Sequence, residues 1–248
     1  MLRESTRMKP IEIVYGLERG AKAVLGVLVA CAAAGIIIGV VTKTGVGLRL
    51  ASGLIDLAGG MLLPAMFFTM LTAIVLGMGV PTTANYVITS TIAAPALVQM
   101  GVPILAAHMF VFYFGIIADV TPPVALAAYA GAGISGGNAL KTGVHASKLA
   151  IAAFIIPYIF VLSPVILMVD ATPLALVMVT LSALVGMIAV SSALCGFLAD
   201  HCRPYERLLL IVAGLLMIKP GGTTDLIGSA IFAVILVMQY TRAKKIAS

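Results

Sequence analysis

The feature that most constrains this chain is a nearly uncharged stretch of 64 residues from position 57 to position 120. Its only side chains that ionise near neutral pH are His108 and Asp119. The apolar sequence is nevertheless broken twice, at residues 77–83 and, just past its end, at residues 121–123. A helix can be interrupted at membrane depth only where protein or a hydrated cavity satisfies the freed backbone groups. Two such breaks therefore predict a binding site.

Composition places the chain among integral membrane proteins of the all-α class. Hydrophobic residues make up 62% of the sequence and charged residues 10%, against about 25% charged residues in an average soluble domain. The mean hydropathy is +1.18. At about 20 residues per span, a chain of 248 residues has room for about six helices and some irregular pieces. The short alternating segments of a membrane barrel are not seen, so we expect a polytopic helical bundle in membrane lipid.

The formal net charge of +6 does not indicate a nucleic-acid partner. The basic residues lie at the ends of apolar runs and form no patch interleaved with aromatic residues. Positive charge beside spans is typical of cytoplasmic loops, so we expect both termini and two loops to be cytoplasmic. The residues behind this expectation are Arg3, Arg7, Lys9, Arg19, Lys22, Lys141, Lys148, Arg203, Arg207, Arg242, Lys244 and Lys245.

Metal, redox and enzyme chemistry have little support in the sequence. Cys195, His201 and Cys202 lie near one another, but their spacing matches no zinc pattern. We expect these cysteines and Cys31 to carry free thiols. No nucleophile–base pair, P-loop or metalloprotease helix is recognisable. We therefore expect neither an enzyme nor a cofactor.

The alternation of apolar runs and polar connections divides the chain into three parts. Residues 1–22 are predicted to form an amphipathic interfacial segment, because apolar residues recur there at near-helical spacing. Residues 23–170 form the core and residues 171–248 a C-terminal helical extension. The elements expected in the core are a span at 23–42, a polar connection at 43–56, a hairpin at 57–99, a discontinuous helix at 104–133, a glycine-rich loop at 131–143 and a span at 149–169. The extension has apolar runs at 173–194, 208–218 and 226–240, the last two short enough to be tilted or partly inserted.

Residues 57–99 have two interpretations. They form either a re-entrant hairpin that enters and leaves on one side, or two ordinary spans joined by a loop. The tip holds glycine, proline and threonine but no charge, which favours the hairpin. If the hairpin counts as no span and the discontinuous helix as one, six crossings put both termini on the same side. Lys43, Arg49 and Lys219 then fall outside, against the usual charge bias.

The first break offers oxygen ligands and a helix N-terminus. Gly77 and Gly79 permit close backbone approach, and Pro81 interrupts the hydrogen-bond ladder. The freed carbonyls are hard ligands suited to sodium, and the N-terminus of the next helix suits an anion. The side chains that add oxygen ligands are Thr82, Thr83 and Asn85. The alternative is a plain helix–helix turn in which Thr82 or Thr83 is the cap.

Two residues before the second break lies Asp119, the only acidic residue between positions 57 and 169. Pro122 and Pro123 interrupt the N–H ladder, and Thr121 is biased away from helix by the proline that follows it. A carboxylate at membrane depth costs about 2.5–3.5 kcal/mol, so we expect Asp119 to face a cavity, a cation or a partner group. It would bind a cation, with Thr121 as a neighbouring ligand, or accept a proton. Alternatively, Asp119 lies near the membrane surface or caps the following segment.

Other polar residues are weaker candidates. His108, with the nearby Tyr113, could relay protons, but a histidine hydrogen-bonded to a neighbouring helix is the commoner arrangement. Asn138, Lys141 and His145 lie in the predicted glycine-rich loop and are interpreted as part of a solvated connection.

Several longer segments resemble the second half of the large permease subunit of tripartite ATP-independent periplasmic (TRAP) transporters. They are Gly-Met-Gly-Val-Pro-Thr-Thr-Ala-Asn-Tyr at 77–86, Ala-Pro-Ala-Leu at 94–97, Ala-Ala-His-Met-Phe-Val-Phe-Tyr-Phe-Gly at 106–115 and Asp-Val-Thr-Pro-Pro-Val-Ala-Leu-Ala-Ala-Tyr-Ala-Gly at 119–131. Residues 31–40 match the preceding span. The chain looks most like the fused-permease branch that works with TAXI-type binding proteins, and its helices from about residue 203 look like the C-terminal extension of that branch.

This resemblance implies an elevator-type secondary transporter with two inverted repeats, each supplying a re-entrant hairpin and a discontinuous helix. It implies that a periplasmic TAXI-type binding protein delivers a small organic anion, usually a carboxylate, and that a sodium gradient drives import across the cytoplasmic membrane of a bacterium or archaeon. Residues 77–83 would form the tip of the second hairpin. Residues 119–124 would form the break in the second discontinuous helix.

The resemblance finds only the second repeat. We therefore expect a split or truncated permease, with the missing N-terminal half and small-subunit region as partners. Asp119 leaves proton coupling open beside sodium. The rival interpretations are a non-transporting membrane scaffold or remnant, and a passive channel in which Asp119 is a filter charge.

Overall fold

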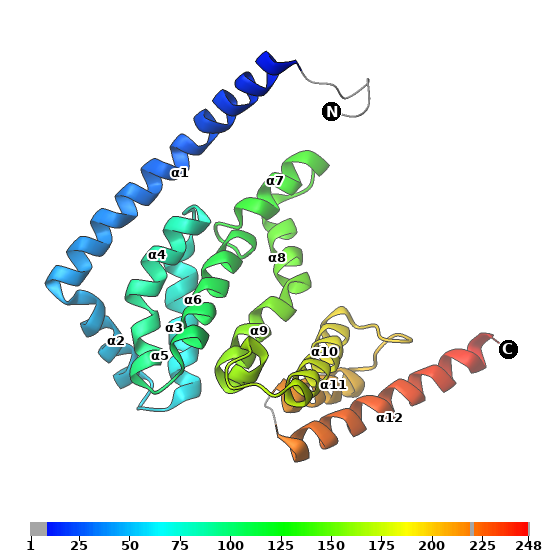
Figure 1. The fold of residues 1–248 in the computed structure, drawn as a ribbon. Coiled ribbons are helices and arrows are strands. Elements are labelled where there is room, and N and C mark those ends of the chain that lie inside the picture. The colour runs from blue at the N-terminus through cyan, green and yellow to red at the C-terminus, as the bar shows by residue number, and fades with distance from the viewer. Residues whose placement is uncertain (1–8, 219–220, 248) are drawn as a thin grey trace.

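The computed structural model describes residues 9–218 and 221–247 (Figure 1). Within these ranges it contains helices and no strand apart from one isolated bridge, which confirms the all-α class. The α-helices are α1 (Pro10–Thr44), α2 (Val46–Leu57), α3 (Leu62–Gly77), α4 (Thr82–Ile92), α5 (Ala94–Gln99), α6 (Ile104–Ile117), α7 (Leu126–Ser135), α8 (Ala139–Leu149), α9 (Ile151–Leu162), α10 (Pro173–Cys195), α11 (Pro204–Ile218) and α12 (Gly222–Ala247). Residues 1–8 of the predicted interfacial segment, and Lys219 and Pro220, lie outside the described residues.

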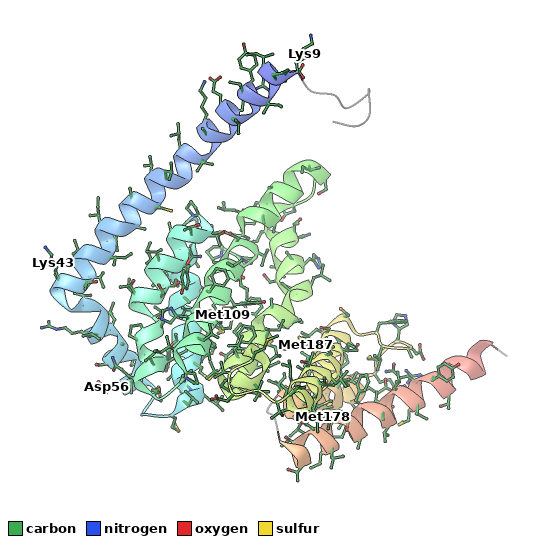
Figure 2. The ribbon with its side chains drawn as sticks, viewed as in Figure 1. Lys9, Lys43, Asp56, Met109, Met178 and Met187 are labelled. Atoms are coloured by element: carbon green, nitrogen blue, oxygen red, sulfur yellow. The ribbon has the colours of Figure 1, made fainter. Side chains whose placement is uncertain are left out.

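The N-terminal helix α1 runs without interruption across position 22, where the interfacial segment was predicted to end. At Gly45 the chain bends by 74° into α2. The predicted polar connection at 43–56 is therefore wrong for most of its length. Gly47 and Ala51, four residues apart, form a buried face on α2, so its small residues pack rather than form a loop. Figure 2 shows Lys43 at the corner and Asp56 at the far end of α2.

The core is built around α6, which contacts α3, α4, α5 and α9. Its two fully buried aromatic rings, Phe110 and Phe114, pack edge to face with their ring centroids 4.8 Å apart. Met66 of α3 and Leu97 of α5 are buried in the same cluster. The helix break in residues 57–99 falls within the predicted segment, between α3 and α4. Whether this hairpin re-enters the membrane stays a prediction.

The discontinuous helix consists of α6, the 3₁₀ turn η2 (Ala118–Val120) and α7. The predicted glycine-rich loop at 131–143 is wrong for most of its length, because α7 continues to Ser135 and α8 begins at Ala139. Asn138 is the N-cap of α8, and its Oδ1 accepts a hydrogen bond from the Lys141 N–H at 3.0 Å. An N-cap of this kind favours helix by about 1 kcal/mol. Here it marks a helix start rather than a solvated connection.

After α9, a 3₁₀ turn η3 (Pro164–Leu167) leads into the extension, in which α10, α11 and α12 pack together. Polar contacts join the start of α11 and the α10–α11 loop to α12. Glu206, only 2% exposed, accepts hydrogen bonds from Gln239 Nε2 at 2.8 Å and Arg242 Nη1 at 2.9 Å. Arg242 also pairs with Asp200 at 2.6 Å. These contacts hold the first turn of α11 and the loop before it against the C-terminal part of α12.

Two described helices are long and apolar enough to cross a membrane, namely α10 and Gly222–Arg242 of α12. The number rises to four if each of two bent pairs is one span, Cys31–Thr44 with α2 and α8 with α9. The apolar run at 226–240 thus lies in a helix long enough to cross, and its tilt or partial insertion stays a prediction. The α-helix there extends beyond the apolar run at both ends. The six-crossing topology stays a prediction.

Candidate ion and anion site

The first break lies between α3, which ends at Gly77, and α4, which begins at Thr82. Gly79 has φ of +71°, in the left-handed region that glycine adopts most readily. The N-cap of α4 is Pro81, and it provides no side-chain cap. Neither Thr82 nor Thr83 caps this helix, so that alternative is wrong, and both threonines are exposed. The N–H groups of the first turn are thus available to a ligand.

The amide of Asn85 lies between two glycines from different helices. A Cβ at Gly115 of α6 would lie 2.6 Å from Asn85 Oδ1, and a Cβ at Gly77 would lie 2.9 Å from Asn85 Nδ2. The amide has room here because both positions lack a side chain. Asn85 is 2% exposed, and its Oδ1 has no hydrogen-bond partner among the described residues. An unpaired buried acceptor costs about 1–3 kcal/mol. Thr69 Oγ1 of α3 is also buried without a partner, and Asn85 Oδ1 is the one of the two that lies beside the first break.

Three side-chain hydrogen bonds hold the second break, which covers residues 121–125. They are Thr121 Oγ1 to Ile117 O at 2.8 Å, Tyr129 Oη to Pro123 O at 2.7 Å and Ser147 Oγ to Val120 O at 3.0 Å. The last of these ties α8 to the break. The hydroxyl of Thr121 is thus engaged with its own helix, although its oxygen retains acceptor capacity.

Asp119 lies in η2 and is half-buried. Its carboxylate makes no hydrogen bond or ion pair within residues 9–218 and 221–247. The alternative that Asp119 caps the following helix is wrong, because the N-cap of α7 is Ala125 and no side chain caps it. Pro122 is half-buried and Pro123 is exposed. The carboxylate is therefore available to a cation or a proton.

The two breaks approach each other through backbone. A Cβ at Gly77 would lie 2.5 Å from Gly115 O, and η2 packs against α3. Gly115 lies one helical turn before Asp119. Within the described chain no hydrogen bond joins Thr82 or Thr83 to Asp119. The structure thus brings Asn85 to α6 and leaves the two threonines exposed at the start of α4.

A family model matches residues 1–175, that of the tripartite ATP-independent periplasmic transporter, DctM component. The chain belongs to this family. The TRAP permease resemblance seen in the sequence is thereby confirmed, and the chain is a multi-pass membrane protein of a transporter family. No curated protein and no solved structure matches it. Both breaks lie inside the matched range, whereas most of α10 and all of α11 and α12 lie outside it.

In this TRAP permease, His108 lies in an interhelical contact. Its Nδ1 is 3.0 Å from Tyr86 Oη of α4, and the two rings also stack edge to face. This confirms the commoner of the two arrangements considered for His108. Tyr113 packs its ring against Phe160 at 5.3 Å, so it joins α6 to α9.

Sequence reasoning misses two residues that shape the site of this permease. Gly115 has a recognisable signal, since an isolated glycine inside an apolar helix often marks close packing. Ser147 has no such signal, because its partner Val120 is 27 residues away and the contact depends on the fold of α8. Cys31, Cys195 and Cys202 carry free thiols.

Proposed function

We propose that this chain is the permease part of a secondary active TRAP transporter that imports small organic anions, with carboxylates as the substrate class and sodium as the coupling ion. The family is one of transporters rather than enzymes, and it implies a periplasmic binding protein and other subunits as partners. We further propose that the binding protein is of the TAXI type. The proposed location is the cytoplasmic (inner) membrane, with both termini in the cytoplasm.

The observation that carries the proposal is the buried, unpaired Oδ1 of Asn85 at the first break. Transporters hold sodium with oxygen atoms from unwound backbone and nearby side chains. Asn85 supplies one such oxygen, and the carbonyls freed between Gly77 and Pro81 supply others. Because Gly77 and Gly115 touch, a sodium ion bound here would link the hairpin to α6. Binding of the ion would then change how tightly these two elements are held together.

The anion is proposed to bind at the start of α4. The exposed hydroxyls of Thr82 and Thr83 lie there beside uncapped N–H groups and the positive end of the helix dipole. Asp119 and Thr121 are proposed to supply a second set of oxygens from the other break. A proton on Asp119 is the alternative coupling species.

Uptake in proteoliposomes tests the transport proposal. The chain is reconstituted with the other transporter components and a binding protein, and uptake of a labelled carboxylate is measured with a sodium gradient, a proton gradient or neither. We expect uptake to need the sodium gradient. Asn85→Ala should abolish it, whereas Gln99→Ala, which removes an exposed amide, should not.

Three outcomes would contradict the proposal. Full uptake by Asn85→Ala and by the triple variant Thr82→Ala, Thr83→Ala, Asp119→Asn would refute the site. Flux that needs neither a binding protein nor a gradient would indicate a passive channel. Absence of any flux in the complete system would indicate a non-transporting scaffold.

Sodium binding is testable without transport. Sodium that binds the folded chain at 100 times its Kd stabilises it by about 2.7 kcal/mol, or about 5–11 °C in Tm for a chain of this size. We expect this shift with sodium and not with potassium, and we expect Asn85→Ala to remove it. An equal shift in Asn85→Ala would place the ion elsewhere.

A further inference from the structure

Three basic side chains recur along one face of α8. They are Lys141, His145 and Lys148, separated by four and three residues, so they lie on the same side of the helix. All three are exposed. None pairs with an acidic side chain in the described parts of the chain. Lys141 and Lys148 therefore give this face of α8 positive charge that no described acidic side chain balances.

Two of these residues border a cavity of about 260 Å³ between α8 and the end of α10. Its lining consists of His145, Lys148, Leu149, Leu194 and Cys195. Because α10 is a candidate span that ends at Cys195, we place the cavity at a membrane surface, at the level of the lipid headgroups. The guanidinium of Arg207 lies at the same helix end, where it donates to the carbonyls of Ala193 and Leu194 at 2.6 and 3.0 Å.

An apolar groove continues from this cavity along α9. A hollow of about 340 Å³ shares Lys148 with the cavity and extends to Ile151 and Phe154. A larger hollow of about 570 Å³ begins at Phe154 and passes Tyr158 and Leu162, with α3 and α11 as its other walls. The lining residues of α9 recur at helical spacing, so they form one stripe down the helix.

The length of the groove along α9 matches the thickness of the hydrocarbon layer of one lipid leaflet. At 1.5 Å per residue, Ile151 to Leu162 spans about 17 Å, and half of a hydrocarbon core of about 30 Å is about 15 Å. The polar atom of this stripe, Tyr158 Oη, is turned to Met70 Sδ at 3.5 Å. A charged pocket at the surface thus leads into an apolar channel of acyl-chain length.

We propose that the cavity beside α8 and the apolar groove along α9 together bind a phospholipid with an anionic headgroup. The phosphate lies against His145 and Lys148, and one acyl chain follows the α9 stripe down to α11. Positive charge at the headgroup end and apolar lining below it favour an anionic phospholipid over a free anion or a zwitterionic lipid. A free anion would fill the pocket alone, and a zwitterionic lipid would gain little from the basic residues. The lipid would join the family-matched core to the extension, independently of the proposed transport function.

Lipid binding by the full-length chain in detergent tests the proposal. Dioleoyl phosphatidylglycerol, dioleoyl phosphatidylcholine and inorganic phosphate are titrated separately, and bound adducts are counted by native mass spectrometry. We expect phosphatidylglycerol to bind about 5-fold more tightly than phosphatidylcholine, because a lysine near the membrane surface contributes about 1 kcal/mol and Lys148 lines the cavity. Lys148→Gln should lower the ratio of the two affinities about 5-fold.

Lys141→Gln is the matched control, because it removes the same charge from the same face of α8 without lining the cavity. It should leave the preference unchanged. Equal affinity of the wild-type chain for the two lipids would overturn the proposal, and so would an equal loss in Lys141→Gln. Inorganic phosphate that displaces phosphatidylglycerol at similar concentration would show a plain anion pocket instead. The comparison of the three ligands on the wild-type chain decides the matter even if a variant fails to fold.

Discussion

The contact between Gly77 and Gly115 makes Gly77→Ala a sharp test of the site geometry. The new Cβ would lie 2.5 Å from Gly115 O and 2.9 Å from Asn85 Nδ2, whereas ordinary contacts begin at 3.4 Å. The α6 backbone would have to move by about 0.9 Å, and overpacking of this kind costs about 1–3 kcal/mol. Gly77 is the last residue of α3, so alanine gains little there from helix propensity. The expected net effect is destabilisation.

Thermal unfolding of the purified chain measures this cost. At about 2–4 °C per kcal/mol for a chain of this size, Tm should fall by about 2–12 °C. Gly39→Ala is the control, since a Cβ there meets nothing within 4 Å and alanine favours the helix by about 0.5–1 kcal/mol. A Gly77→Ala variant as stable as the wild-type chain would refute the close approach of α3 to α6.

Three further predictions concern polar contacts, each measured by Tm. Tyr86→Phe, which loses its bond to a histidine, should cost about 0.5–1.5 kcal/mol, whereas Tyr113→Phe should cost less. Arg242→Gln should lower Tm, because it removes the ionic partner of Glu206 and Asp200, although Glu206 keeps its hydrogen bonds from Gln239 and the Arg203 N–H. The hydrogen bond from Arg242 lowers the pKa of the Asp200 carboxyl below its ordinary 3.8, so its stabilisation is complete above that value and is lost as pH falls through the folded-state pKa. Acidification below about pH 4 should therefore lower Tm more steeply in the wild-type chain than in Asp200→Asn.

Helix breaks were predictable because their causes are local. Glycine and proline at the first break, and paired prolines at the second, interrupt the backbone ladder whatever surrounds them. The structure accordingly ends α3 at Gly77 and begins α4 at Thr82. The second interruption likewise falls between Val120 and Leu126.

The connections were harder to predict, because polarity and glycine content are ambiguous beside a membrane. Residues 43–56 and 131–143 contain several glycines, which suggest loops, yet α2 occupies most of the first range and α7 and α8 together occupy most of the second. In α8 the N-cap at Asn138 outweighs the neighbouring glycines. The N-cap was visible in the sequence, but it is one signal among several that favour a turn.

Contacts distant in sequence could not be predicted at all. The meeting of Asn85 with Gly115 depends on how the hairpin packs against α6, and the pairing of Glu206 with Arg242 depends on the return of α12. Helical periodicity indicates which face of a helix is buried, but it does not indicate which residue on another helix that face will meet. The atoms that define the candidate site meet through such contacts between distant helices.

The surroundings of Asn85 argue for a binding site over a connecting turn. A turn that only joined α3 to α4 would gain stability from an apolar residue at this position, because the unpaired Oδ1 costs about 1–3 kcal/mol. Gly77 and Gly115 also give up the packing that side chains would provide, and their absence makes the space that the amide fills. Two helices thus leave out side chains at the point where a third places a buried amide whose oxygen has no partner. Natural proteins accept such local conflicts mainly at functional sites, and a cation bound to the Asn85 oxygen would remove the conflict.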